Sequence, residues 1–429
     1  MTNRIWIAAA ALLLALPLSA QNGTYNGFSP YSVYGVGDLH AAGTAYNASM
    51  GGVGIAPRNK RFVNTMNPAS ATARDSLSFM ADFGLSGKFS LFTQGDLHNT
   101  KTLLNINNFV ISFPMWRHTA FMTGIKPFSD TGFSMAYMDN ITSGDQSIGY
   151  TGNRAYGAYG DGGLNEFFAG ASALLWNRLS VGAQYSLYFG TITKYSMSQF
   201  SDASYRTQTL GDTLQVRAHT AKFGLQYEQP IGTGRLTVGA TYRLKAKVCG
   251  HAIEYSNISE LDLGRHELEK DKIQLGDEIG VGLAYAQGDK WSMEFDYIRG
   301  DWTGSNFDAV RGFRNNGVYS FTTGLTQSFK AGFEITPNRN DIRYFMRRCT
   351  YRLGAYMDQS YYQVDGHNIT AAGITLGMTV PVYQGYNGIT FAIDLGQRGF
   401  GSAFVKENYL GFHVGFNIFD IWFRKPQYQ

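Results

Sequence analysis

Apolar and polar residues alternate along most of the chain. Between Leu179 and Phe189 every second residue is apolar, and mostly small or polar residues stand between them. The same alternation recurs at 236–244 and 291–297. A period of two predicts β-strands with one face against apolar surroundings and the other facing water.

About fourteen segments share this pattern. We expect strands at about 76–92, 107–116, 119–138, 164–175, 178–195, 213–228, 234–254, 272–287, 290–301, 317–335, 342–361, 367–383, 388–399 and 406–419. The gaps after even-numbered strands are short, as at Pro337–Asp341, and most others are long, as at Thr93–Asn105. This rhythm predicts an all-β fold, a transmembrane antiparallel β-barrel of about 14 strands over residues 76–419.

The two ends of the chain fall outside the alternation. Residues 1–20 combine a basic start at Arg4, an apolar run and small residues before Gln21, which predicts a cleaved secretory signal peptide. An N-terminal membrane anchor is the less favoured alternative, because the run is short for a spanning helix. Export together with amphipathic strands indicates the outer membrane of a Gram-negative cell. Residues 420–429 are expected to form a periplasmic tail.

Residues 21–75 are rich in glycine and alanine and do not alternate. We expect this segment to fold into the lumen as a plug, because a wide barrel needs filling and the apolar residues would otherwise be exposed. The alternative is a segment that hangs free in the periplasm. The expected plug residues are Met50, Gly51, Gly52, Gly54, Asn67, Pro68 and Ala69.

The third expected strand is interrupted at 127–132. Proline cannot donate to a strand ladder, and glycine lets the backbone leave the pleat. Pro127, Phe128 and Gly132 are therefore expected to form a lateral opening in the barrel wall. The alternative is a plain β-bulge.

These features resemble the outer-membrane long-chain fatty-acid-transporter family. The resemblance rests on the Met50–Gly54 stretch, the Asn67–Ala69 turn, the strand number and the Pro-Phe interruption. It implies a plugged barrel for passive uptake of hydrophobic small molecules, with lateral exit through the kinked strand into membrane lipids. Some relatives, such as the shuttle barrel of the type IX secretion system, act with other proteins. The alternative function is thus a non-transporting partner barrel in a protein secretion or outer-membrane protein assembly complex.

Charged residues on the water-facing side of the strands are expected to line the lumen. They are Arg243, Lys245, Lys247, Glu294, Asp296, Glu334, Arg348, Arg352 and Asp394. Mixed signs in a confined space favour ion pairs that hold the plug over a selective ion path.

Composition limits the other possibilities. A net charge of +4 is too small to indicate a nucleic-acid partner. None of the eight histidines has a catalytic or metal-binding partner at a suitable spacing, so we expect no enzyme, metal or cofactor. Cys249 and Cys349 are expected on opposite faces of the wall, which predicts free thiols.

Overall fold

The computed structural model describes nine stretches of the chain. They are residues 27–75, 77–141, 152–202, 204–257, 265–267, 273–307, 321–383, 387–400 and 405–421. The expected signal peptide and most of the expected C-terminal tail lie outside the described residues.

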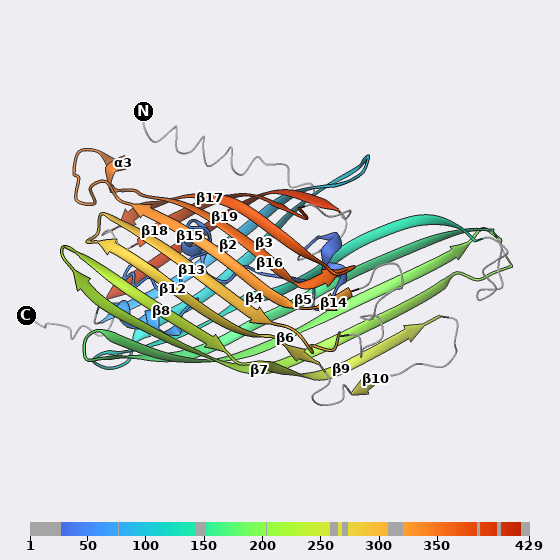
Figure 1. The fold of residues 1–429 in the computed structure, drawn as a ribbon, viewed down its shortest axis with the longest axis horizontal. Coiled ribbons are helices and arrows are strands. Elements are labelled where there is room, and N and C mark those ends of the chain that lie inside the picture. Colours follow the sequence, from blue (N-terminus) through green and yellow to red (C-terminus); the bar gives the residue numbers. More distant parts are fainter. Residues whose placement is uncertain are drawn as a thin grey trace, which may run out of the picture.

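Fourteen antiparallel strands close into a barrel, which confirms the predicted fold (Figure 1). The wall strands are β2 (Ser78–Gln94), β3 (Leu97–Pro114), β4 (Thr119–Ile141), β5 (Gly152–Leu175), β6 (Leu179–Phe200), β7 (Gln208–Ile231), β8 (Gly234–Arg243), β12 (Asp277–Gln287), β13 (Trp291–Asp301), β15 (Leu325–Ile335), β16 (Thr350–Val364), β17 (His367–Tyr383), β18 (Asn387–Arg398) and β19 (Lys406–Ile421). The last strand pairs with the first, from Lys406 opposite Thr93 to Ile421 opposite Ser78.

Shorter elements extend the wall or fill the lumen. Near the wall strands are β9 (Ala246–Ser256), β10 (Arg265–Glu267), β11 (Gln274–Leu275) and β14 (Phe321–Thr323). The N-terminal segment holds the 3-10 helix η1 (Pro30–Val33), β1 (Asp38–Leu39), α2 (Ala45–Ala48) and the 3-10 helix η2 (Pro68–Ala73). Helix α3 (Phe345–Arg348) lies between β15 and β16. Within the described stretches, no helix is both long and apolar enough to cross a membrane.

The outward faces of the wall strands form an apolar belt. Val238 and Phe295 are 49% and 51% exposed, whereas the inward neighbour Thr237 is only 5% exposed. Such a belt on a closed barrel is stable only where lipid covers it, because water would otherwise meet a large apolar surface.

Val238→Arg or Phe295→Arg should destabilise the barrel by roughly 2–4 kcal/mol, because an ion near the middle of the bilayer loses its hydration. Ser292→Arg is the matched control, since it lies on the inward side of the same strand, two residues from buried Glu294. Heat-modified migration after folding into lipid measures the effect. Equal losses for both faces would contradict the assignment of the faces.

The expected long loop at Thr93–Asn105 is wrong. β2 and β3 form a hairpin joined by a tight turn at Gly95, whose φ of +58° suits glycine. The polar residues that suggested a loop stand on the first half of β3 (Leu97–Pro114), which is largely exposed. Their polarity fits a strand end that extends past the apolar belt and meets water on its outer face.

The expected tight turn at Pro337–Asp341 is also wrong. The connection between β15 and β16 spans residues 336–349 and contains α3, so β16 begins at Thr350. Asp341 causes the difference, because its Oδ1 accepts the backbone N–H groups of Arg343 and Tyr344 and starts a helical turn.

The prediction of free thiols is confirmed for Cys249 and Cys349. The predicted strand position of Cys349 is wrong. It is a buried residue at the C-terminal end of α3, and its Sγ donates to the carbonyl of Phe345.

Candidate functional site

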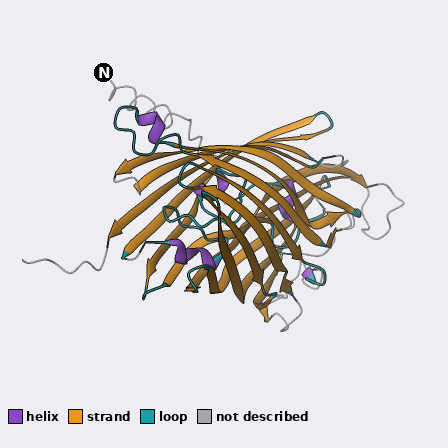
Figure 2. Ribbon diagram, turned by 60° about the vertical axis from the view of Figure 1, so that its left-hand side comes forward, coloured by secondary structure: helices purple, strands orange, loops and turns teal. Residues whose placement is uncertain are grey.

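The plug, defined here as residues 27–75, lies inside the barrel (Figure 2). Met50 and Ala69 are fully buried. The Gly51 N–H donates to Thr375 Oγ1 of β17 at 2.7 Å. The N–H groups of Gly54 and Ile55 both donate to the Asp296 carboxylate of β13, at 2.6 and 2.9 Å. Backbone groups of the plug are thus satisfied by side chains of the wall.

Two positions in the plug require glycine. Gly51 and Gly52 have φ of +70° and +78°, a region that L side chains rarely adopt. A Cβ on Gly51 would also lie 2.8 Å from the carbonyl oxygen of Ala355. The glycine-rich stretch therefore lets the plug approach the wall closely.

The Asn67-Pro68-Ala69 turn is held at the opposite side of the lumen. Asn67 Oδ1 accepts the Ala69 N–H at 3.0 Å and caps η2, while its Nδ2 donates to the Ile55 carbonyl at 2.8 Å. The turn packs against Gly182 and Gly224, where a Cβ would lie within 2.6 and 2.1 Å of turn atoms. Small wall residues thus create the space for this turn.

Arg352 joins the wall to the plug by charge and stacking. Its Nε donates to Glu334 at 2.8 Å, and both side chains are buried or nearly so. Its guanidinium also lies over the rings of Tyr46 and Phe62 at 4.6 and 4.7 Å. The ion pair joins β15 and β16 of the wall and positions the guanidinium that contacts the plug. That the inward charges hold the plug in place stays a prediction.

Two of the other inward charges also have partners on the wall. Arg243 lies 3.6 Å from Glu278, and Asp394 accepts a hydrogen bond from Tyr356 at 2.8 Å. Glu294 lies fully buried on the inner face of β13.

Three of the predicted lumen charges lie elsewhere. Lys245 and Lys247 are exposed, because Leu244 and Lys245 both face outward between β8 and β9 and shift the alternation by one. Arg348 lies in α3, beyond the wall strands, with its guanidinium 5.0 Å from the Phe345 ring.

β4 is not broken at the predicted interruption. It pairs with β5 along its whole length, with one register shift between Pro127 and Ser129. Phe128 points inward and packs on Tyr188, with ring centroids 4.4 Å apart. The Pro-Phe signal therefore marks a β-bulge on this side of the strand.

The other edge of β4 changes its partner at the same place. The ladder between β3 and β4 ends where Phe109 faces Ile125. Beyond it, β1 of the plug pairs with β4, with Asp38 opposite Asp130 and Leu39 opposite Ser129. Within the described residues, the plug takes the place of β3 on this edge.

Further hydrogen bonds extend this contact along the latch segment, defined here as Ser29–His40. The Ser29 N–H donates to the Gly132 carbonyl at 2.8 Å, and the His40 N–H donates to the Phe128 carbonyl at 2.9 Å. A Cβ on Gly132 would lie 1.5 Å from the Gly27 oxygen, so glycine is required here. Pro127, Phe128 and Gly132 therefore lie where the plug meets the wall.

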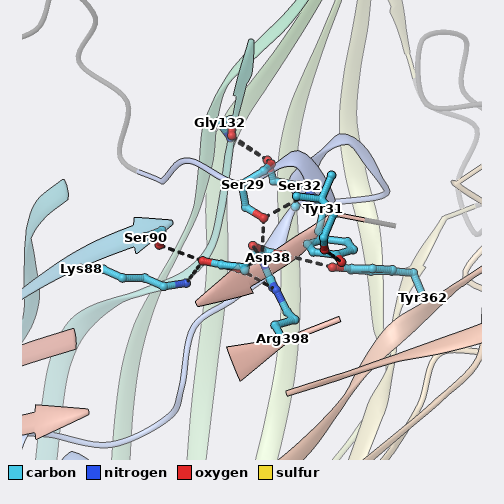
Figure 3. Close-up of polar contacts among 12 residues, drawn as sticks. Ser29, Tyr31, Ser32, Asp38, Lys88, Ser90, Gly132, Tyr362 and Arg398 are labelled. Atoms are coloured by element: carbon cyan, nitrogen blue, oxygen red, sulfur yellow. Dashed lines mark hydrogen bonds and ion pairs between the residues drawn. The ribbon is translucent and has the colours of Figure 1, made fainter. Parts of the chain in front are cut away.

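An ion-pair network holds the latch segment (Figure 3). Arg398 of β18 lies 2.7 Å from Asp38 and 2.8 Å from Glu407 of β19. Glu407 is fully buried and also accepts bonds from Lys88 at 2.6 Å and Ser90 at 2.9 Å. The network joins the plug to three strands around the barrel closure.

Aromatic residues complete the latch (Figure 3). Tyr362 donates to Asp38 at 3.2 Å, and the Tyr31 hydroxyl donates to the Val405 carbonyl. The Arg398 guanidinium lies 4.6 Å from the Tyr31 ring centroid. Sequence reasoning missed this network because Asp38 and Arg398 are 360 residues apart and neither stands in a motif.

A lumen cavity of about 420 Å³ borders the latch segment. Its lining includes Leu39, Leu103 of β3 and Asp130 of β4, together with Lys330 of β15 and Asp394 of β18. The cavity therefore reaches both strands at the place where their ladder ends.

His40 adds a pH-dependent contact, since its Nε2 pairs with the Asp130 carboxylate. Burial lowers the pKa of His40, but the carboxylates of Asp130 and Asp38 outweigh it and raise the pKa above 6.5. A raised pKa stabilises the latch fully below pH 6.5, and this stabilisation is lost as the pH rises through the raised pKa.

We therefore expect the latch segment to open more at alkaline pH. The measurement is the rate of thiol labelling at Leu39→Cys, with Cys249 and Cys349 replaced by serine. The labelling rate of the protein with His40 is divided by that of the protein with His40→Gln. This ratio cancels the effect of pH on the reactivity of the thiol itself. This ratio should rise towards one as the pH increases from about 6 to about 9; a ratio that falls would contradict the pairing.

Several solved structures share this fold at low sequence identity. The CymD monoaromatic hydrocarbon channel is 12% identical, with a TM-score of 0.56, over 91% of this chain and 99% of that one. The Ralstonia pickettii toluene transporter TbuX is 14% identical, with a TM-score of 0.54, over 89% and 98%. A Pseudomonas aeruginosa FadL homologue is 10% identical, with a TM-score of 0.52, over 90% and 99%. None of these structures is named as an enzyme. The expected resemblance to the fatty-acid-transporter family is confirmed for the fold.

Comparison at the level of sequence gives the family. Among curated proteins, none matches this chain. A protein-family model described as BamG matches residues 1–429. Since that match spans the whole sequence, the chain belongs to the BamG family.

Proposed function

We propose that this protein takes up hydrophobic small molecules passively across the Gram-negative outer membrane, by lateral passage through the wall between β3 and β4. The observation that carries the proposal is the change of partner on β4. Its ladder with β3 ends at Ile125, and the latch segment binds the edge at Ser129–Gly132 instead. Moving the latch segment opens this part of the wall without breaking the closure between β2 and β19.

The physical chemistry favours this route. The plug fills the lumen and denies a straight aqueous path, and the cavity of about 420 Å³ lies directly behind the latch segment. An apolar solute gains about 0.8 kcal/mol for each methylene that leaves water, so delivery into lipid needs no energy source. Pro127, Phe128 and Gly132 border the proposed opening.

The similar structures support the class of ligand. CymD is named a monoaromatic hydrocarbon channel, and TbuX is named a toluene transporter. A monoaromatic hydrocarbon or a fatty acid is therefore the first ligand to test. The signal peptide at 1–20 would be removed during export to the outer membrane.

A second candidate function is a partner barrel in a protein secretion or outer-membrane protein assembly complex. The family name BamG hints at a partner role. The connection of residues 336–349 also favours it, because this end of the barrel was expected to carry only tight turns. A projecting, ordered connection offers a surface to another molecule.

The test uses cells that lack the gene, with and without a restored copy. Uptake of radiolabelled toluene and oleate is measured beside the proteome of the outer membrane. Uptake that depends on the barrel, with a normal set of surface proteins, would support transport. Unchanged uptake together with loss of surface proteins would refute transport and favour the partner barrel.

A further inference from the structure

We propose that the β15–β16 loop, residues 336–349, binds anionic phospholipid headgroups at the periplasmic face of the membrane. This site is independent of the uptake route, because it lies at the end of the barrel where the wall strands meet in tight turns. Figure 1 shows α3 at the end of the barrel where β19 finishes. The proposal rests on the place, the charge and the internal order of this loop.

The loop begins at the edge of the lipid-facing belt. Ile335 ends β15, opposite Trp291 on one side and Tyr351 on the other. Tyr351 has the same outward parity as exposed Leu353, and its hydroxyl donates to the Met346 carbonyl at 3.0 Å. This bond ties α3 to the outer side of the wall, where an aromatic belt marks the membrane interface.

The loop exposes apolar side chains at that level. Ile342 is 99% exposed and Met346 is 52% exposed, and Tyr344 and Phe345 are also exposed. The tight turn at Trp176 also exposes an apolar side chain, but the β15–β16 loop gathers four of them in one connection. Exposed apolar side chains that continue a lipid-facing belt are stabilised by contact with acyl chains.

Its charge selects the headgroup. Residues 337–349 contain four arginines and one aspartate. Arg339 lies near Asp289 and Arg347 near Asp341, whereas Arg343 and Arg348 form no ion pair with any described residue. Two cations above an apolar surface fit an anionic lipid, whose phosphate accepts the guanidinium hydrogen bonds.

The loop is folded before any ligand arrives. The Asn338 N–H donates to the Arg347 carbonyl at 2.9 Å, which closes the base of the loop. Asp341 caps the turn through Arg343 and Tyr344, at 2.9 and 2.7 Å. The backbone that carries the arginines is thus held in place, so binding orders few backbone groups.

The test is a lipid titration of the full-length barrel in detergent, followed by native mass spectrometry. The probes are dioctanoyl-phosphatidylglycerol and its phosphatidylcholine analogue. The variant is R343Q with R348Q, and the matched control is R117Q with R178Q, which removes the same charge from two tight turns at the same end. Heat-modified migration verifies folding of both.

Phosphatidylglycerol affinity should fall by about 25-fold in the loop variant and by less than about two-fold in the control, from about five-fold per arginine. Ile342→Ser should weaken the binding of both lipids, because it removes an apolar contact and leaves the charge of the loop unchanged. If the loop variant fails to fold, the wild-type protein suffices. Its phosphatidylglycerol affinity should fall at high salt while its phosphatidylcholine affinity stays constant.

Equal losses in both arginine pairs, or no preference for phosphatidylglycerol in the wild-type protein, would overturn the lipid site. Unchanged lipid affinity of the loop variant, with loss of a stoichiometric protein from solubilised membranes, would assign the loop to a protein partner and also overturn it.

Discussion

Arg398→Met should destabilise the folded barrel by about 3–5 kcal/mol and release the latch segment, because it leaves the fully buried Glu407 carboxylate and the partly buried Asp38 carboxylate without their partner. Glu407 is fully buried and, among the described residues, keeps Lys88 as its remaining cation. Asp38 loses its ion pair with Arg398 and keeps the hydrogen bond from Tyr362. Methionine keeps most of the side-chain volume, so the effect reports charge rather than a cavity. Chemical denaturation measures the stability, and hydrogen exchange over residues 29–40 measures the release.

The control for this variant is Arg398→Met combined with Asp38→Asn and Glu407→Gln. Removing the unpaired charges should restore much of the lost stability, since the cost comes from buried ions. Faster exchange confined to the latch segment is the expected signature. Unchanged stability and exchange in the single variant would contradict a role for this network in holding the plug.

Arg352→Met should have a similar effect at the other side of the plug, a loss of about 3–5 kcal/mol. Arg352 is the buried cation bound to Glu334, and Glu294 lies on the neighbouring strand. The variant would leave these carboxylates close together without a cation and remove the stacking on Tyr46. Denaturation in detergent gives the loss of stability.

Two comparisons isolate the cause for Arg352. Arg352→Met with Glu334→Gln should recover part of the loss, because one buried charge is removed with its partner. Arg352→Lys keeps the charge but loses the planar stacking on Tyr46 and Phe62. Its stability should therefore lie between those of the wild-type protein and of Arg352→Met. A loss from Arg352→Lys as large as that from Arg352→Met would mean that stacking, rather than charge, holds the plug.

The barrel was predictable because its pattern repeats. Val238 and Thr237 already show which face meets lipid, and the same period of two recurs in strand after strand. The plug was predictable for the opposite reason, since Met50 to Gly54 and Asn67 to Ala69 have no such period yet carry apolar residues that need cover. Both the alternation of the strands and its absence in the plug can be read from short stretches of the sequence.

The latch was not predictable, because it is made of contacts between distant residues. Nothing near Asp38 indicates Arg398, and nothing in β4 indicates that a plug strand would replace β3 beyond Ile125. The Pro127-Phe128 signal was real, but its consequence depends on tertiary pairing. At 336–349 the aromatic residues led to the prediction of a strand. The structure has a helical turn there, which begins at the Asp341 cap.

The most direct test of lateral uptake locks the latch segment to the wall. Leu39 and Ser129 are opposite each other in the β1–β4 pair, at a separation that suits a disulfide in antiparallel strands. The variant carries Leu39→Cys and Ser129→Cys, with Cys249 and Cys349 replaced by serine. A matched control carries only Leu39→Cys. Uptake of radiolabelled toluene is measured in oxidised and reduced cells.

Oxidation should abolish uptake in the double-cysteine variant, reduction should restore it, and the single-cysteine control should not respond to either. These results would show that the latch segment must leave β4 for the solute to pass. Uptake that continues at the same rate through the oxidised, fully cross-linked barrel would contradict lateral passage between β3 and β4.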